Sequence, residues 1–99
     1  MWWIRVDKRR PAVVVQTDQV RESRVRSFLV VPLTSRLHLE ELPGNVRLHK
    51  RVTGLPKASV ANVYDVQKVL RLDFLERTGL LPPRDLSFID DGLRLVLDL

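Results

Sequence analysis

The chain has 99 residues, of which 44% are hydrophobic, a net charge of +5 and no cysteine. This length and composition predict a single folded domain over residues 1–99 with a core of its own. The lack of cysteine excludes a disulfide scaffold, a thiolate zinc site and a cysteine nucleophile. No apolar run approaches the roughly 20 residues that cross a bilayer, and charges follow Met1 too closely for a signal peptide. A soluble, cytoplasmic protein without a membrane partner is therefore expected.

Charge is divided unevenly along the chain. Residues 1–71 hold 14 Lys/Arg and 6 Asp/Glu, a net charge of +8, whereas residues 72–99 hold 3 and 6, a net charge of −3. This division predicts that the body of the protein meets a polyanion, while the C-terminal segment lies away from it or pairs with a basic surface. The alternative is a basic surface that only keeps the protein in solution.

The first two thirds of the chain indicate β-structure. Strands are predicted over residues 2–6, 12–16, 25–34, 45–49 and 58–66, with an alternative end of the last strand at Val69. Between them, an exposed polar connection is predicted over 17–24 and a loop over 35–44. Residues 12–16 are apolar on both faces, which predicts a central, covered strand. Because a residue before proline is pushed into extended conformations, Arg10 is expected at the mouth of that strand. Pro32 predicts a bulge or a local edge in the strand that ends at Thr34.

The last third changes periodicity. A short helix is predicted over residues 72–77, ended by Thr78 and Gly79, and Pro82-Pro83 is suited to open a final helix. That helix carries one apolar stripe at three- and four-residue spacing, made of Leu86, Ile89, Leu93, Val96 and Leu97. The stripe is expected to cover the open side of the sheet. The predicted fold class is mainly β (α+β): a small barrel or strongly curved sheet with a C-terminal covering helix.

The usual catalytic motifs are absent from the sequence. There is no P-loop, no glycine-rich dinucleotide turn, no G-x-S-x-G and no H-E-x-x-H. His38 and His49 are expected at the surface, and a two-histidine nuclease would need both rings at one phosphate. Asp90 and Asp91 point about 100° apart on a helix, which favours a solvated face over a metal site. Neither a metal nor a cofactor is expected.

Arginine, hydroxyl and backbone groups remain, and this set can act on RNA. The substrate brings its own nucleophile, because the 2′-hydroxyl can attack the adjacent phosphorus once a group accepts its proton and another stabilises the phosphorane oxyanion. A guanidinium fork suits the stabilising task, and a threonine hydroxyl can donate one more hydrogen bond to the same phosphate.

Four segments in order resemble the MazF/PemK family of toxin endoribonucleases. They are residues 10–15 (RPAVVV), residues 30–35 (VVPLTS), Gly54-Leu55 with Ser59-Val60, and the closing apolar helix that ends near Leu97. The resemblance covers nearly the whole chain. It implies an SH3-like β-barrel that forms a homodimer, cleaves single-stranded RNA without metal and is neutralised by a cognate antitoxin.

The resemblance also implies the catalytic residues, Arg10 and Thr34. In the family the arginine is assigned acid–base work and the threonine stabilisation at the scissile phosphate. A guanidinium has a pKa above about 12, so Arg10 suits an electrostatic clamp better than a general base. Water, a backbone carbonyl or His38 are the alternatives for that base.

The chain departs from the family between the first two predicted strands, where only residues 7–9 replace a longer loop that often reads Gly-Ser-Glu-Gln. The predicted substrate-binding residues are Lys8, Arg9, Gln16, Ser35 and Arg36. Of these, Lys8 and Arg9 are candidates for contacts with the RNA backbone, or for a solvated turn, and Arg36 for a phosphate. Gln16 and Asp65 are candidates for facing bases. Alternation predicts that one of Trp2 and Trp3 is core or dimer interface and the other partly exposed.

Two other functions stay open at this point. One is a gyrase-poisoning toxin that resembles CcdB, although the ending Val96-Leu97-Asp98-Leu99 lacks the tryptophan-glycine-isoleucine C-terminus associated with that activity. The other is a non-catalytic RNA-binding barrel that has lost activity with its first loop.

Overall fold

The computed structural model describes residues 1–15 and 26–98. The elements in these residues are β1 (Trp2–Arg5), β2 (Arg9–Val14), β3 (Ser27–Thr34), the 3-10 turn η1 (Leu37–Glu41), β4 (Val46–Leu48), α2 (Lys50–Thr53), β5 (Ser59–Ala61), η2 (Val63–Asp65), β6 (Gln67–Leu70), η3 (Arg71–Asp73), β7 (Phe74–Arg77) and α3 (Pro83–Leu97). The predicted polar connection over 17–24 lies outside the described residues.

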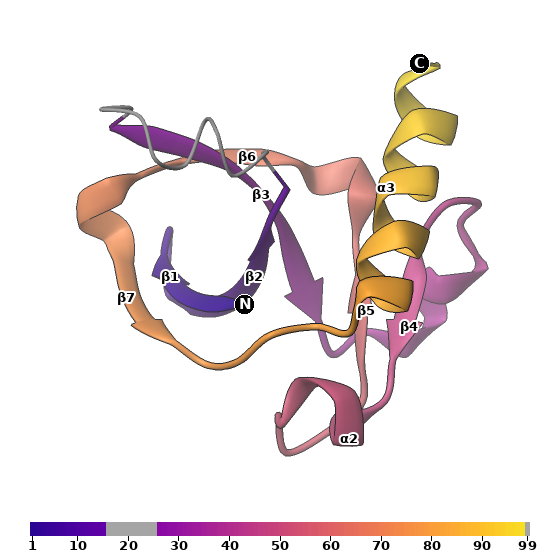
Figure 1. The fold of residues 1–99 in the computed structure, drawn as a ribbon, viewed down its shortest axis with the longest axis horizontal. Helices are drawn as coiled ribbons and strands as arrows, with labels where there is room; N and C mark the ends of the chain where they lie inside the picture. Colours follow the sequence, from indigo (N-terminus) through magenta and orange to yellow (C-terminus); the bar gives the residue numbers. More distant parts are fainter. Residues whose placement is uncertain (16–25, 99) are drawn as a thin grey trace.

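The strands form one antiparallel sheet that curves strongly around itself. Its order is β4-β5-β3-β2-β1-β7, and β6 pairs with the free side of β3. The chain passes from β6 through η3 into β7 and so encircles β1 (Figure 1). The described strands do not close a hydrogen-bonded ladder, because the path of paired strands ends at β4 and β7. The fold is therefore a mainly antiparallel sheet with a C-terminal helix.

The predicted bulge at Pro32 is wrong, but the predicted local edge has a counterpart. Residues 30–32 pair with β2 in a continuous register. On its other side, β3 pairs with β6 over residues 27–30 and with β5 at Leu33 and Thr34. Pro32 falls between these two partners, where its missing N–H interrupts no strand pair, and its carbonyl accepts from the backbone N–H of Asn62 at 3.0 Å.

The strand predicted over 58–66 is broken in the structure. Only Ser59–Ala61 is extended, and the chain then turns through η2 before β6 begins. The side chain of Asn62 causes the break, because its oxygen accepts from the backbone N–H of Tyr64 at 3.3 Å and caps the turn. An asparagine that bonds to the backbone two residues on competes with strand geometry.

The helix predicted over 72–77 is also wrong. Arg71–Asp73 form a single 3-10 turn, and Phe74–Arg77 are strand β7, which pairs with β1. Leu72 is 89% exposed. Pairing of Trp3 with Glu76 and of Ile4 with Phe74 decides the conformation here, since so short a segment has little helical stability of its own.

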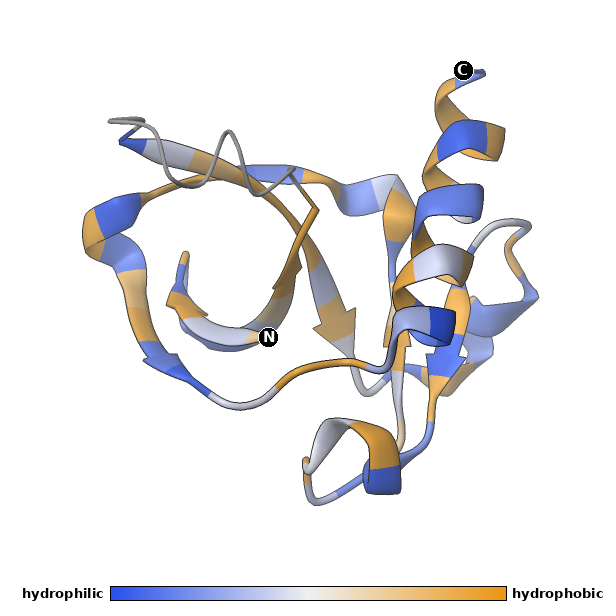
Figure 2. Cartoon of the chain, viewed as in Figure 1, coloured by the Kyte–Doolittle hydropathy of each residue, from blue (hydrophilic) through white to orange (hydrophobic). Residues whose placement is uncertain are grey.

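Two apolar clusters make the core, one on each face of the central strands β2 and β3. Figure 2 shows a hydrophobic run along β2. Ala12 and Val30 belong to the cluster enclosed by the curved sheet, and Val13 and Val31 to the larger cluster under α3. Successive residues of a strand point to opposite faces, which explains why consecutive valines serve both clusters. The predicted central, covered strand is confirmed, although it runs from Arg9 to Val14.

Helix α3 begins at Pro83, as predicted, and packs on β4 and η2. The predicted stripe is only partly correct. Ile89 is buried and Leu93 and Val96 are partly buried, but Leu86 and Leu97 are exposed. The contact face is centred on Gly92, whose backbone approaches Gly44 so closely that a Cβ would overlap the Gly44 carbonyl.

The predicted loop over 35–44 contains the 3-10 turn η1. After β4 the chain forms one α-helical turn, α2, which ends where Gly54 adopts a φ of 74°. None of the helices in the described ranges is long and apolar enough to cross a membrane.

Candidate active site

A groove lies where β2 begins and β3 ends. Its volume is about 580 Å³, and it collects residues from the turn before β2, from the end of β3, and from the segment between α2 and η2. The polar and aromatic side chains that line it include Trp3, Lys8, Arg9, Arg10, Thr34, Ser35, Arg36, Lys57, Asn62 and Asp65. All of the predicted site residues that fall in the described ranges therefore line one groove. Gln16 lies outside the described residues.

The strand register explains why Arg10 and Thr34 meet. Ala12 pairs with Pro32 across β2 and β3. Continuing this antiparallel register by two residues sets Arg10 level with Thr34. Opposite residues of an antiparallel pair present their side chains on the same face, so a guanidinium and a hydroxyl share one end of the sheet. Arg10 is extended, as Pro11 predicts, and lies within β2.

Arg10 is held by a carboxylate from the short turn before it. Its Nε donates to Asp7 Oδ1 at 3.3 Å, and the same oxygen accepts from the backbone N–H of Lys8 at 2.9 Å. The hydrogen bond from Arg10 holds the pKa of Asp7 below its usual value. The Arg10 side chain keeps 34% of its surface exposed, so the guanidinium is both oriented and open to the groove.

Thr34 is ordered by the backbone that follows it. Its Oγ1 accepts from the backbone N–H of Arg36 at 3.2 Å, which leaves the hydroxyl proton available to a ligand. Thr34 is half-buried, whereas Ser35 and Arg36 are exposed at the groove. Because Thr34 Oγ1 already accepts the hydrogen bond from Arg36, its hydroxyl can donate its own proton to a ligand in the groove.

Arg9 has two partners of its own. Its guanidinium carbon lies 4.7 Å from the centroid of the Trp3 ring, and one of its nitrogens donates to Glu76 Oε2 at 2.9 Å. The prediction for the tryptophans is too simple, because both Trp2 and Trp3 are half-buried. Trp2 packs edge-to-face on Phe74 in the enclosed cluster, with ring centroids 5.7 Å apart.

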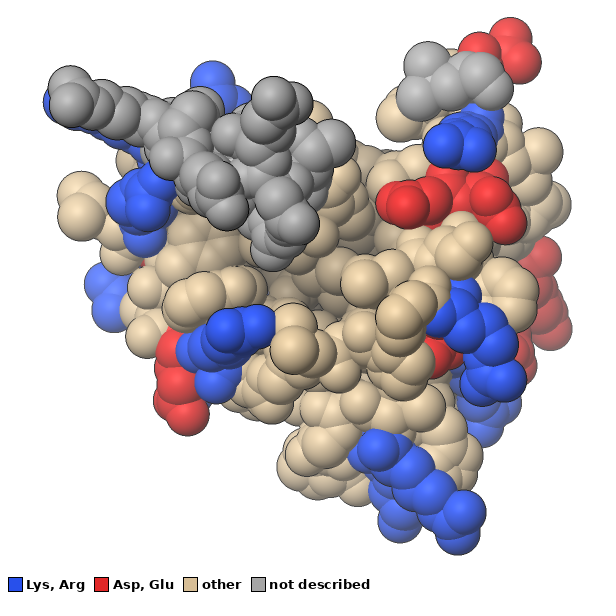
Figure 3. Space-filling model, in the orientation of Figure 1, with Lys and Arg blue, Asp and Glu red and all other residues tan. Residues whose placement is uncertain are grey.

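The groove is positively charged. Five cations line it, namely Lys8, Arg9, Arg10, Arg36 and Lys57, against one carboxylate, Asp65. A concave surface lined by charges of one sign concentrates its field, and this one favours a polyanion. In Figure 3 basic side chains also gather over α2, and acidic side chains gather along the middle of α3. The uneven charge of the sequence thus has a spatial counterpart.

The two histidines do not line this groove. His38 is exposed in η1, as predicted. His49 is exposed and caps α2, where its Nδ1 accepts from the backbone N–H of Arg51 at 3.1 Å. In the described part of the chain, no group of three or more His, Asp or Glu side chains is placed to hold a metal ion.

Two groove residues were missed at the sequence level. Lys57 comes from the turn after α2. Asn62 links its own segment to the one before β4, because its Oδ1 accepts from Asn45 Nδ2 at 3.2 Å and from the backbone N–H of Tyr64. The sequence did carry a signal for Asn62, because it is a polar residue inside the apolar strand predicted over 58–66. A residue that favours a turn within a predicted strand indicates that the strand is interrupted there. Nothing local distinguished Lys57 from the other exposed lysines.

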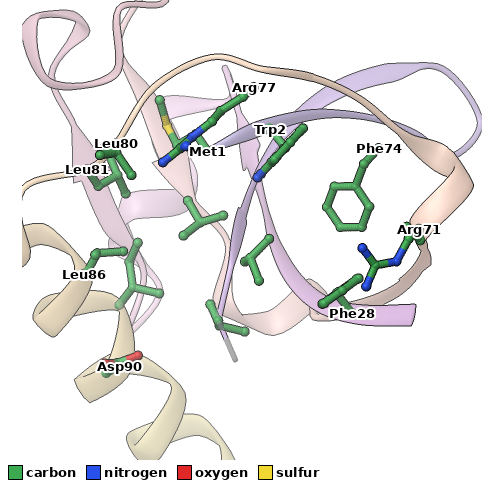
Figure 4. A pocket seen from close by; sticks show the side chains of 14 residues that line it. Met1, Trp2, Phe28, Arg71, Phe74, Arg77, Leu80, Leu81, Leu86 and Asp90 are labelled. Atoms are coloured by element: carbon green, nitrogen blue, oxygen red, sulfur yellow. The ribbon is translucent and has the colours of Figure 1, made fainter. Parts of the chain in front are cut away.

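A second cavity, of about 640 Å³, lies between the sheet and α3. Figure 4 shows its aromatic wall of Trp2, Phe28 and Phe74, with Leu80, Leu81 and Leu86 on the side of the helix. Arg71, Arg77 and Asp90 are its charged residues. None of the predicted site residues within residues 1–15 and 26–98 lines it, so size alone does not locate the candidate site.

The chain is similar to known proteins over nearly its whole length. Residues 2–97 match the family model described as a PemK-like, MazF-like toxin of type II toxin–antitoxin systems. The chain is 39% identical over 92 residues to endoribonuclease MazF6 of Mycobacterium tuberculosis, a match that covers 93% of this chain and 81% of the relative. Endoribonuclease MazF2 of Mycobacterium bovis matches to the same extent.

Solved structures agree in fold. The Mycobacterium tuberculosis toxin MazF-mt6 superimposes with a TM-score of 0.88 at 22% identity, covering 99% of this chain and 95% of the other. An endoribonuclease in complex with its cognate antitoxin from a mycobacterial species gives a TM-score of 0.81 at 17% identity, with coverage of 99% and 90%. The family match, the sequence relatives and the shared fold lead to one conclusion: the chain belongs to the PemK-like, MazF-like family of type II toxins.

Proposed function

We propose that this protein is the toxin of a toxin–antitoxin pair, an endoribonuclease that cleaves single-stranded RNA at the groove where β2 begins and β3 ends. The observation that carries the proposal is the convergence of Arg10 and Thr34, level with each other across two strands, in a groove lined by five cations and one carboxylate. Family membership supports the reaction class, and the convergence of Arg10 and Thr34 in this groove supports their assignment as catalytic residues.

Arg10 is assigned to the charge that develops during the reaction. Attack by the 2′-hydroxyl on the adjacent phosphorus forms a bond to the 2′-oxygen and breaks the bond to the 5′-oxygen, which leaves a 2′,3′-cyclic phosphate and a 5′-hydroxyl. Negative charge builds on the phosphoryl oxygens on the way, and an oriented guanidinium stabilises it in a partly desolvated groove. Thr34 donates a second hydrogen bond to the same oxygens. Neither role requires Arg10 to lose a proton.

Lys8, Ser35 and Arg36 are assigned to the flanking phosphates. All three are exposed and line the same groove as Arg10 and Thr34. Among the described residues, Lys8 and Arg36 form no ion pair, in contrast to Arg9, which pairs with Glu76, so their charge is available to RNA. Such contacts act on every sequence alike, because they release counterions without reading bases.

The remaining parts of the proposal concern assembly. We assign the chain to a homodimer that acts in the cytoplasm and binds a cognate antitoxin. Leu70, Leu72 and Leu75 follow one another in the chain on β6, η3 and β7 and are 54%, 89% and 38% exposed. We assign these exposed apolar side chains to an interface, because association would remove them from water. We also assign the curved sheet to the SH3-like barrel of the family, since β6, η3 and β7 already encircle β1.

Mapping the RNA ends tests the function directly. The purified protein is incubated with single-stranded RNA, with and without EDTA, and the ends are identified chemically. We expect 5′-hydroxyl and 2′,3′-cyclic phosphate ends and no effect of EDTA. RNA that is bound but left intact would support a non-catalytic barrel instead, and a stabilised gyrase cleavage complex would support the CcdB-like alternative. Either result contradicts the proposal.

A further inference from the structure

Arg9 and Arg10 are adjacent, yet they lie on opposite faces of β2. Arg10 shares a face with Thr34 across the β2–β3 pair, whereas Arg9 shares the other face with Pro11, which is two residues along. Pro11 pairs with Trp3, and Trp3 pairs with Glu76 on β7. Arg9 is therefore the diagonal neighbour of Trp3, and Glu76 stands beside the same ring.

The guanidinium of Arg9 is fixed in position by both neighbours. One of its faces covers the Trp3 ring at 4.7 Å, and Glu76 receives its hydrogen bond at 2.9 Å. Trp3 is half-buried against the core, so it gives the guanidinium a firm support. The Arg9 side chain is still 54% exposed, and Arg9 lines the groove. One face of the guanidinium is occupied, and the opposite face is available to a ligand.

Arg9 is poorly suited to hold a phosphate. The Glu76 carboxylate offsets its charge and occupies part of its donor fork, so a phosphate would have to compete with an existing ion pair. Lys8 and Arg36 line the same groove and form no ion pair with any residue that the structure describes. The exposed plane of a guanidinium has a different use in RNA binding, because unstacked bases of single strands stack on arginine planes as they do on aromatic rings.

We propose that Arg9, supported by Trp3 and anchored by Glu76, is a stacking platform for one nucleobase of the bound single-stranded RNA. The base belongs to a nucleotide next to the scissile phosphate, since Arg10 and Arg9 follow each other at the mouth of β2. This inference rests on the proposed function and replaces a backbone-binding role for Arg9 with a base-binding one. Stacking tolerates any base, so the platform contributes affinity and register rather than strict sequence choice.

The test combines a protein variant with an RNA lesion. The probe is a fluorescein-labelled single-stranded oligonucleotide that contains the mapped cleavage sequence, with a 2′-deoxy sugar at the cleaved position so that it binds without reacting. A series of the same oligonucleotide carries one abasic site at each position in turn. Affinities are measured by anisotropy for the wild type and for Arg9→Lys, which keeps the charge and loses the plane. Arg77→Lys is the matched control, because Arg77 is an exposed arginine beside Glu76 that does not line the groove.

If the platform exists, one abasic position weakens wild-type binding by about 10- to 100-fold, the range expected for loss of a base stack. Arg9→Lys then binds the oligonucleotide without an abasic site about as weakly as the wild type binds the abasic one. Its affinity falls no further when that position is made abasic. Glu76→Gln gives the same coupling in weaker form, because Arg9 keeps Trp3 but loses its anchor. Arg77→Lys behaves as the wild type.

Two results overturn the platform. Either no abasic position near the cleavage site weakens wild-type binding, or the loss persists in full in Arg9→Lys, so that the two changes are additive. In both cases the wild type still cleaves intact RNA, and the proposed function stands. Wild-type protein that neither binds this oligonucleotide nor cleaves its all-ribose counterpart contradicts the proposed function, and the platform with it. Circular dichroism confirms that each variant is folded.

Discussion

The groove and the apolar cavity are of similar volume, about 580 and 640 Å³, but they differ in where the chain builds them. The groove lies at strand ends and turns, where backbone and charged side chains reach solvent together. The cavity lies against the middle of the sheet, where rings and aliphatic side chains complete the core. The proposed chemistry lies at the ends of strands, where five cations converge without being buried.

The aromatic wall of the cavity has a structural explanation. Phe74 meets Trp2 and Phe28 edge-to-face, with ring centroids 5.7 and 5.5 Å away, and such pairs stabilise a core beyond the area they bury. The groove has no comparable ring cluster among its described lining residues. Its aromatic component is Trp3, which supports Arg9. Substitutions in the two regions should therefore have separable effects.

The largest difference in the rate of RNA cleavage is expected between substitutions of two arginines, one in each region. Arg10→Ala removes the guanidinium from the reacting phosphate and should lower the rate of RNA cleavage by about 100- to 1,000-fold, as losing one transition-state donor does elsewhere. Arg77→Ala removes an arginine that lines the other cavity and should cleave RNA at the wild-type rate. Single-turnover cleavage of one oligonucleotide measures both. Undiminished cleavage by a folded Arg10→Ala protein contradicts the assigned site.

The packing region is tested by two glycines. Gly92→Ala places a Cβ against the Gly44 carbonyl, so α3 must move away from the loop at Gly44. This movement should lower the free energy of unfolding by about 1–3 kcal/mol. Gly54→Ala has no atom within 4 Å of the new Cβ, and its cost should be about 1 kcal/mol because φ there is 74°. Urea unfolding gives both values. A smaller loss for Gly92→Ala than for Gly54→Ala contradicts the close helix contact.

Thr34 should matter less than Arg10. Thr34→Val keeps the shape but loses the hydroxyl that donates to the phosphate, and cleavage should slow by about 10-fold, the scale of one hydrogen bond to a charged group. Thr34→Ser keeps the hydroxyl and should retain most activity. The single-turnover rate is again the measurement. Equal rates for Thr34→Val and the wild type would remove Thr34 from the mechanism.

The flanking cations should change binding rather than chemistry. Lys8→Ala and Arg36→Ala should each reduce the slope of log affinity against log salt by about 0.7, the value for one phosphate contact on a single strand. Affinity for an uncleavable single-stranded oligonucleotide is measured from low to physiological salt. An unchanged slope for both variants means that neither contacts the RNA backbone. Lys68→Ala is the control, because Lys68 is exposed on β6 outside the groove.

The smallest expected effect concerns the ion pair behind Arg10. The pKa of Asp7 is lower in the folded chain than its usual value of 3.8, because Arg10 donates to it. At pH values above the usual pKa, the ion pair between Asp7 and Arg10 therefore stabilises the folded state. This stabilisation disappears as the pH falls through the lowered pKa of Asp7. Asp7→Asn should melt slightly below the wild type at neutral pH, and the two Tm values should converge in acid. A constant Tm difference at all pH values contradicts this account.

The sequence predicted several local features correctly. Pro11 makes Arg10 extended, the apolar run after it becomes a covered strand, and Pro82-Pro83 opens the C-terminal helix, because proline restricts φ whatever the rest of the chain does. The family resemblance, carried by four short segments, is confirmed by the match over residues 2–97. These features depend on residues close together in the chain, and local sterics and alternation suffice to define them.

The tertiary structure decided what depends on distant partners. Phe74–Arg77 is a strand because β1 offers it a pairing edge, and Arg9 contacts Trp3 and Glu76, which lie on two other strands. The proposal that Arg9 contacts a base rather than a phosphate rests on these two neighbours. Alternation along β2 already separates Arg9 from Arg10, but it does not say what each face meets. The composition and order of the residues thus determined the charge, the central strand and the family. Long-range pairing determined which cations share a face, because strand register is a property of two segments and not of one.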